Sequence, residues 1–151
     1  MELDIELLRK LPKTDLHCHL DGSMRISTIL DLAKKNNIQL PTTDEEELKK
    51  MVQMDENCKS LVDYLKAFDI TTRVMQDYDS LKRIAFELAE DAAAENVRYL
   101  EVRYSPYLHQ QKGMKLTDIV EAVIDGLREA ERQFDIKTGV IICGLRHLNP
   151  S

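Results

Sequence analysis

Apolar residues recur at spacings of three and four positions in several segments, a pattern typical of helices with one buried face. These segments are residues 4–10, 27–36, 60–75, 80–95 and the stretch from Thr117 to Phe134. The first helix should end before Pro12, because the residue preceding a proline avoids helical geometry. Thr43 and Glu46 fit the two ends of a capping box at the start of a helix, and Thr117 is expected to cap the last helix.

Three other segments have the character of strands, and they are residues 14–20, 97–105 and 137–147. In the second segment apolar and polar side chains alternate, as they do on a strand with one buried face. The third has a continuous apolar run at residues 140–143, which predicts a buried strand. Strands that alternate with helices predict a parallel sheet. The expected fold class is therefore α/β: the first part of a (β/α) barrel, with about three parallel strands and a helical insert after the first.

Length and composition indicate a single domain over residues 1–151, since 43% hydrophobic residues are enough for a packed core. The 21 basic and 27 acidic residues give a net charge of −6 without a basic block, which argues against nucleic acid as a partner. No apolar run approaches the roughly 20 residues of a membrane span, and the start of the chain lacks the apolar stretch of a secretory signal. Three widely spaced cysteines suit a reduced, cytoplasmic protein; they are Cys18, Cys58 and Cys143.

The candidate chemistry lies in residues 14–23, which read Thr-Asp-Leu-His-Cys-His-Leu-Asp-Gly-Ser. Residues two apart on a strand point to the same face, so His17 and His19 should project together and can share one metal ion. Imidazole suits zinc best, and other first-row metals are open alternatives. Burying two histidines and their flanking carboxylates is costly unless something satisfies them, so a metal site is favoured over a pair of ordinary core histidines.

The same alternation sorts the neighbours of the two histidines. Asp15 and Asp21 fall on the histidine side of the strand. The intervening residues should point into the helix layer, which excludes the cysteine as a ligand; they are Leu16, Cys18 and Leu20. A catalytic zinc needs three protein ligands and an open position for water. Either of two later histidines could complete the site, although a supporting or structural role is favoured for each; they are His109 and His147.

Residues 11–23 resemble the first strand of adenosine deaminases, which are zinc enzymes with a TIM-type barrel in the metallo-dependent hydrolase superfamily. The resemblance continues through the helical insert, through residues 101–106 (Glu-Val-Arg-Tyr-Ser-Pro) on the second strand, and through Leu-Arg-His at 145–147, and it covers residues 10–151. It implies zinc-dependent hydrolytic deamination of adenosine and 2′-deoxyadenosine in purine salvage.

The resemblance also implies roles for particular residues. His17 and His19 would bind zinc, His19 would also lie against the nucleoside, and Asp21 would hydrogen-bond the 5′-hydroxyl of the ribose. An apolar lid over the substrate would come from Leu61, Tyr64, Leu65 and Phe68, although their spacing alone is that of an ordinary core stripe. Further side chains would support the site without being catalysts; they are Glu101, Arg103, Ser105 and His147.

The family's acid and base residues are expected to lie beyond Ser151, where the sequence stops just after the third predicted strand. In the family the later part of the barrel supplies the third zinc histidine, a His-Ala-Gly-Glu segment with the proton-donating glutamate, an orienting histidine and an Asp-Asp pair. A closed TIM barrel needs eight strands and roughly 250 residues. The chain is therefore expected to be an amino-terminal portion of a deaminase with no catalytic acid or base of its own, and a second chain that completes the barrel is a candidate partner.

Two alternatives stay open. The first is a deaminase of another purine, adenine or an N6-substituted AMP. Adenine deaminases of the superfamily tend to have Ile-Glu-Gly where this chain has Leu-Asp-Gly at 20–22, and N6-methyl-AMP deaminases tend to have Asn at the Asp21 position. Asp21 therefore favours a substrate with a free ribose hydroxyl. The second is a non-catalytic half-barrel binding module that folds and docks without metal. The PHP phosphoesterases also open with two histidines on a strand, but residues 101–106 and the insert argue against them.

Overall fold

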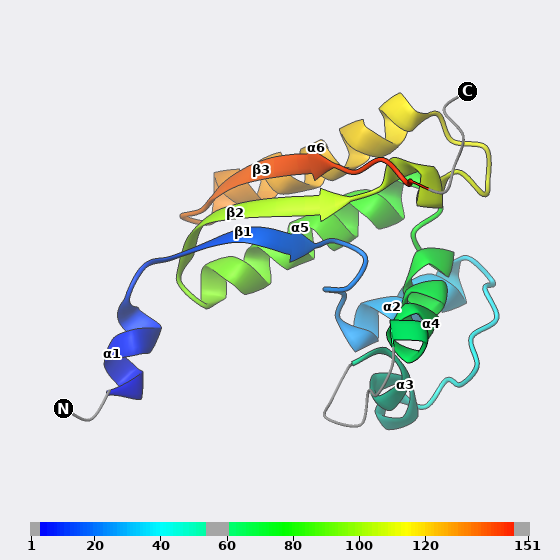
Figure 1. The fold of residues 1–151 in the computed structure, drawn as a ribbon, viewed down its shortest axis with the longest axis horizontal. Helices are drawn as coiled ribbons and strands as arrows, with labels where there is room; N and C mark the ends of the chain where they lie inside the picture. The colour runs from blue at the N-terminus through cyan, green and yellow to red at the C-terminus, as the bar shows by residue number, and fades with distance from the viewer. Residues whose placement is uncertain (1–3, 54–60, 147–151) are drawn as a thin grey trace.

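The computed structural model describes residues 4–53 and 61–146. These residues contain three parallel strands in the order β1 (Lys13–His19), β2 (Val97–Tyr104) and β3 (Lys137–Ile142). All three strands run in the same direction, so their carboxyl ends lie at one edge of the sheet (Figure 1). The parallel sheet and its three strands are confirmed.

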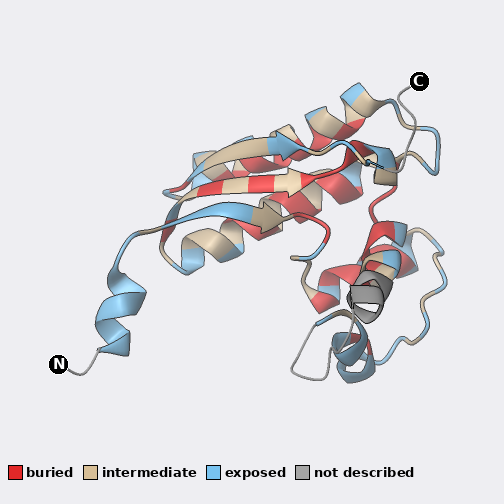
Figure 2. Cartoon of the chain, in the orientation of Figure 1, coloured by how far each residue is buried: buried red, intermediate tan, exposed pale blue. Residues whose placement is uncertain are grey.

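Two long helices, α5 (Tyr78–Ala94) and α6 (Leu116–Gln133), cover one face of the sheet (Figure 1). The core lies between these helices and the strands, where Figure 2 shows buried residues on the central strand and on the helices behind it. Leu100 and Val102 of β2 are almost completely buried. The two helices pack closely because Gly126 has no side chain: a Cβ atom there would lie 2.1 Å from the carbonyl oxygen of Lys82.

The helical insert that follows β1 is also confirmed. It consists of α2 (Ile26–Lys35), α3 (Glu45–Val52) and α4 (Leu61–Arg73), which gather beyond the carboxyl end of β1 (Figure 1). Charged side chains join its first helix to α5: Arg25 binds Glu90 at 2.7 Å and Asp91 at 2.5 Å. The insert is therefore fixed relative to the helix layer of the sheet.

The helix expected at 4–10 is α1 (Ile5–Lys10), and it ends before Pro12 as predicted. It lies apart from the helix layer at the amino end of β1 (Figure 1) and has no buried residue. Lys13 Nζ holds its last turn by donating to the carbonyl oxygens of Arg9 and Leu11, both at 3.1 Å, and to that of Glu95 at 2.8 Å. Among the described residues, none of the helices is long and apolar enough to cross a membrane.

Both predicted helix caps were wrong. The helix α3 is capped by Asp44, which accepts from the amide of Glu47 at 2.9 Å, so the capping residue is one position later than Thr43 and Glu46 implied. Thr117 lies inside α6, and its hydroxyl donates to Asp118 at 3.3 Å. The residue at the N-cap of α6 is Lys115, and its side chain makes no capping hydrogen bond.

Three predictions about strand ends and burial also failed. The strand β3 ends at Ile142, before the predicted 147, and it is half-buried to exposed because no described strand pairs with its outer edge. Leu16 is 58% exposed instead of packing into the helix layer, since β1 is the other edge of the sheet. The short helix η1 (Pro106–His109) directly after β2 was not predicted.

Candidate functional site

His17 and His19 lie side by side at the carboxyl end of β1. Their ring centroids are 5.4 Å apart and the ring planes are inclined by 49°. The expectation that both project to one face is therefore confirmed. The side chain of His19 is 39% exposed and His17 is exposed as well, so both rings remain accessible to a ligand.

Asp21 lies beside this pair, in the loop that leaves the strand. The residue is 6% exposed, and its Oδ1 is 3.6 Å from Nδ1 of His19. No described group hydrogen-bonds that oxygen. Burial raises the pKa of the Asp21 carboxyl, and the nearby His19 partly offsets this effect. A buried carboxylate with an unused acceptor is well suited to accept a hydrogen bond from a hydroxyl group of a ligand.

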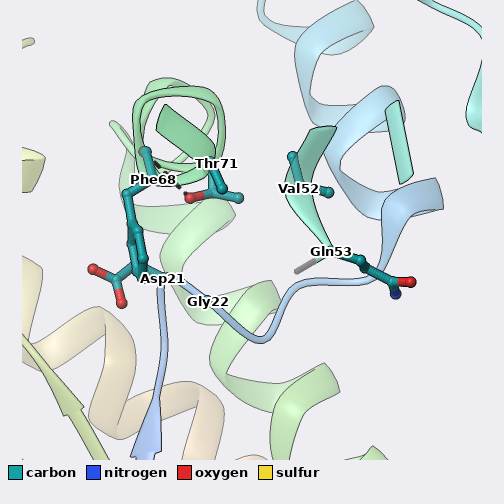
Figure 3. A pocket seen from close by; sticks show the side chains of 7 residues that line it. Asp21, Gly22, Val52, Gln53, Phe68 and Thr71 are labelled. Atoms are coloured by element: carbon teal, nitrogen blue, oxygen red, sulfur yellow. Dashed lines mark hydrogen bonds between the residues drawn. The ribbon is translucent and has the colours of Figure 1, made fainter. Parts of the chain in front are cut away.

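A cavity of about 330 Å³ opens next to Asp21 (Figure 3). It is lined by the loop after β1, by the carboxyl end of α3 and by one side of α4; the residues are Asp21, Gly22, Val52, Gln53, Ala67, Phe68 and Thr71. The Phe68 ring contacts the His19 ring edge-on, with centroids 6.3 Å apart. Phe68 is thus the residue of the expected lid that the structure brings to the site. The side chains of Leu61, Tyr64 and Leu65 lie outside the described residues.

Arg103 projects from β2 to the histidine side of the sheet. Its Nη1 is 2.7 Å from Nε2 of His17, and its Nη2 donates to Sγ of Cys143 at 3.1 Å. Glu101 lies on the same face but accepts from the hydroxyl of Tyr99 at 3.0 Å. Ser105 is 5% exposed, and its hydroxyl has no hydrogen-bond partner in the described part of the chain. Of these three candidates for supporting roles, only Arg103 is shown in contact with a histidine of the pair.

Two further residues behave differently from a metal ligand. Asp15 uses Oδ1 to accept from the backbone amide of His17 at 3.0 Å. Cys18 packs against the core with its Sγ 3.5 Å from the hydroxyl of Ser23, and burial raises the pKa of its thiol. The exclusion of Cys18 as a ligand therefore agrees with its position.

The later histidines do not complete a metal site among the described residues. His109 is fully buried in η1 with its ring 5.9 Å from that of Tyr104, and burial lowers the pKa of its imidazole to about 4. Within residues 4–53 and 61–146 no three histidine, cysteine or acidic side chains are close enough to bind one metal ion. The donor set there fits two ligands of a zinc ion, His17 and His19, and not a complete catalytic site.

The carboxyl-terminal residues, from His147 to Ser151, lie outside the described part of the chain. The supporting role expected for His147 is therefore untested. The same holds for the expectation that the family's acid and base residues lie beyond Ser151, and both stay predictions.

Some residues of the site were missed by sequence reasoning. Cys143 follows β3 at the same sheet edge as the histidines, so the rule that carboxyl ends of parallel strands meet could have placed it there. Thr71 lines the cavity three residues after Phe68, on the same side of α4. No pattern in the sequence indicated that Val52 and Gln53 line the cavity, because their position there depends on how α3 packs.

Comparison with protein families gives a match to adenosine deaminase over residues 12–151. The chain is 52% identical over 141 residues to an adenosine deaminase of Clostridium botulinum, a match that covers 93% of this chain and 43% of the relative. It is 49% identical over 150 residues to a probable adenosine deaminase of Dictyostelium discoideum, which covers 99% of this chain and 19% of the relative. The chain thus spans less than half the length of these relatives.

Solved structures share the fold. An amidohydrolase from Burkholderia ambifaria with bound zinc aligns at a TM-score of 0.77 and 27% identity, over 94% of this chain and 39% of that one. An adenine deaminase from Arthrobacter aurescens aligns at a TM-score of 0.76 and 29% identity, over 87% of this chain and 39% of that one. The N6-methyl-AMP deaminase of Arabidopsis thaliana aligns at a TM-score of 0.71 and 32% identity, over 92% of this chain and 42% of that one.

Proposed function

This chain belongs to the adenosine deaminase family, and from that premise we propose that it provides the amino-terminal part of a zinc-dependent enzyme that deaminates adenosine and 2′-deoxyadenosine to the corresponding inosines and ammonia. In this proposal its three strands are the first part of a TIM-type barrel, and the reaction belongs to purine salvage. The free thiols of Cys18 and Cys143 agree with a reducing compartment such as the cytoplasm.

One observation carries the proposal: two accessible imidazoles and a buried carboxylate converge at one end of a strand, beside a cavity. His17 and His19 have rings 5.4 Å apart, and Asp21 lies 3.6 Å from His19. Neutral imidazole nitrogens are preferred zinc ligands. Neither a plain core stripe nor a docking surface needs these three groups aligned around an unused carboxylate oxygen.

Each residue has a separate task in the proposed reaction. A zinc ion held by His17 and His19 would supply Lewis-acid activation of a water molecule. Asp21 would accept a hydrogen bond from the ribose 5′-hydroxyl and so orient the nucleoside. Phe68, in edge contact with His19, would exclude bulk water from that side of the substrate. The third zinc ligand and the groups that move protons would come from polypeptide outside residues 4–53 and 61–146.

Asp21 also separates adenosine from the competing substrates. A 5′-phosphate placed at the cavity would meet a carboxylate whose remaining acceptor oxygen repels it, whereas a hydroxyl would satisfy that oxygen. Adenine has no ribose and leaves the oxygen unpaired. This favours a nucleoside over adenine or N6-methyl-AMP, the substrates named for two of the structural relatives.

A chimeric enzyme tests the proposal. The chain replaces the 141 matched residues of the Clostridium botulinum adenosine deaminase, and deamination is measured with adenosine, adenine and AMP. The expected result is turnover with adenosine preferred, and its loss when His17 or His19 is replaced by Ala. A chimera that folds and binds zinc but prefers adenine or AMP would refute the substrate assignment.

The isolated chain should not be catalytic in this proposal, because the described residues hold only two of the ligands. A separate polypeptide with the remaining barrel strands could complete it in trans. Stable complex formation without metal, unaffected by replacing both histidines with Ala, would instead identify a non-catalytic binding module. Appreciable deamination by the isolated chain would contradict the division of the site.

A further inference from the structure

Arg103 differs from the ion-paired arginines of the described chain in what it binds. Those arginines contact carboxylates; they are Arg9, Arg25, Arg83 and Arg98. Arg103 instead contacts an imidazole nitrogen of His17 at 2.7 Å and the sulfur of Cys143 at 3.1 Å. No carboxylate within residues 4–53 and 61–146 forms an ion pair with it. Imidazole nitrogen and cysteine sulfur are donor types that proteins use to hold zinc.

The contact with His17 has only one chemical interpretation. A guanidinium group has no acceptor, so the Nε2 atom of His17 must accept the hydrogen bond through its lone pair. The proton of the neutral ring is then on Nδ1. A metal ion that bound His17 through Nε2 would need the same lone pair, so the guanidinium occupies the place of a cation at this ligand.

The position of Arg103 makes this contact a link between all three strands. Its backbone pairs with His19 of β1 and with Ile141 of β3. Its side chain reaches His17 on the first strand and Cys143 just after the third. The guanidinium thus spans the carboxyl edge of the sheet, where the two histidine rings lie.

We propose that Arg103 is a cation placeholder: in the metal-free chain it holds the His17 ring with Nε2 free of a proton, and it must leave that nitrogen before a metal ion binds. The proposal rests on the assignment of His17 as a zinc ligand made above. Arg103 is a positioning residue in this scheme. It orders the ligand in advance, but its hydrogen bond and its positive charge both compete with the incoming metal.

Zinc titration of the 151-residue chain against a chelating indicator tests this competition. Arg103→Gln should bind zinc about tenfold to a hundredfold more tightly than the unchanged chain, the range expected for losing one competing charge-assisted hydrogen bond. Arg98→Gln is the matched control, because it removes the same charge from the same strand at an exposed pair with Asp135. Its zinc affinity should stay within about twofold, the size of effect expected for an exposed charge.

A second variant and a second readout protect the test from misfolding. Arg103→Lys keeps the charge but cannot span both partners, so its zinc affinity should lie between those of the unchanged chain and Arg103→Gln. Far-UV circular dichroism checks that each variant is folded. The ring nitrogens of His17 are observed by ¹⁵N NMR without metal: the unchanged chain should show the Nδ1–H form, and Arg103→Gln should gain the Nε2–H form.

Unchanged or weaker zinc binding in the folded Arg103→Gln variant would overturn the proposal, and so would an unchanged His17 tautomer. The failure of the proposed function has a different signature. If His17→Ala leaves zinc binding unaltered, the ligand assignment fails, whatever the Arg103 variants show.

Discussion

Acidification should destabilise the chain through His109, a histidine that takes no part in the proposed site. The residue is 0% exposed, and neither ring nitrogen has a hydrogen-bond partner of ordinary geometry among the described residues. Burial lowers the pKa of its imidazole from 6.5 to about 4, and the backbone of Met75 offsets part of that effect. The folded state therefore binds a proton more weakly than the unfolded state does.

The sign and size of the effect follow from this difference. Because the folded-state pKa is below the unfolded-state value, the stability contribution is complete above pH 6.5 and is lost as the pH falls toward 4. A tenfold change in proton affinity corresponds to about 1.4 kcal/mol, so the complete effect is about 3 kcal/mol. Between about pH 7.5 and pH 5 the free energy of unfolding should fall by about 2 kcal/mol from this residue alone.

Urea unfolding followed by circular dichroism at the two pH values measures the change. His109→Gln keeps a polar side chain of related shape without titrating in this range, so the variant should lose most of the pH dependence even if it is less stable throughout. Asp21 acts in the opposite direction, because its raised pKa favours the folded state as the pH falls, and an Asp21→Asn background removes that contribution. An equal pH dependence with and without His109 would refute the reasoning.

Three further predictions concern packing and the site. Gly126→Ala should lower the free energy of unfolding by about 1–3 kcal/mol, because the new methyl group overlaps the Lys82 carbonyl oxygen; Gly144→Ala, which meets nothing within 4 Å, is the matched control in the same urea titration. Asp21→Asn in the chimera removes a charge-assisted hydrogen bond to the substrate, so kcat/KM for adenosine should fall about tenfold or more and the discrimination against AMP should decrease. An unchanged ratio of kcat/KM for adenosine and AMP would contradict the assigned contact. Phe68→Ala should raise KM for adenosine more than Ala67→Gly does, since only Phe68 is in ring contact with His19, and equal effects in steady-state kinetics would disprove its role as a cover.

The placement of the two histidines could be predicted from the sequence because it depends on a single local rule. Side chains two apart on a strand point to the same face, and the rings of His17 and His19 do lie together although the pairing of β1 with β2 is irregular between Asp15 and Cys18. The same rule could not predict that Leu16 is exposed, because it gives the side of the strand and not its burial. Burial depends on whether a neighbour covers that side, and at the edge of the sheet none of the described elements buries it.

Other features depended on packing that no local pattern encodes. Asp44 caps α3 in place of Thr43, and both residue types are favourable at a helix N-terminus, so residue type alone does not choose between them. The apolar run in β3 predicted burial, but the strand is an edge of the described sheet. The contact of Arg103 with His17 required the register between β1 and β2, which includes an irregularity between Asp15 and Cys18.

Zinc stoichiometry of the isolated chain tests the central claim most directly. Metal content is measured after dialysis against a weakly competing buffer, for the unchanged chain and for His17→Ala, His19→Ala and Cys18→Ser. We expect a single zinc-binding event that either histidine substitution abolishes, and that the cysteine substitution leaves intact because Cys18 faces the core. Zinc binding that survives the loss of both histidines, or that disappears with Cys18, would contradict the account.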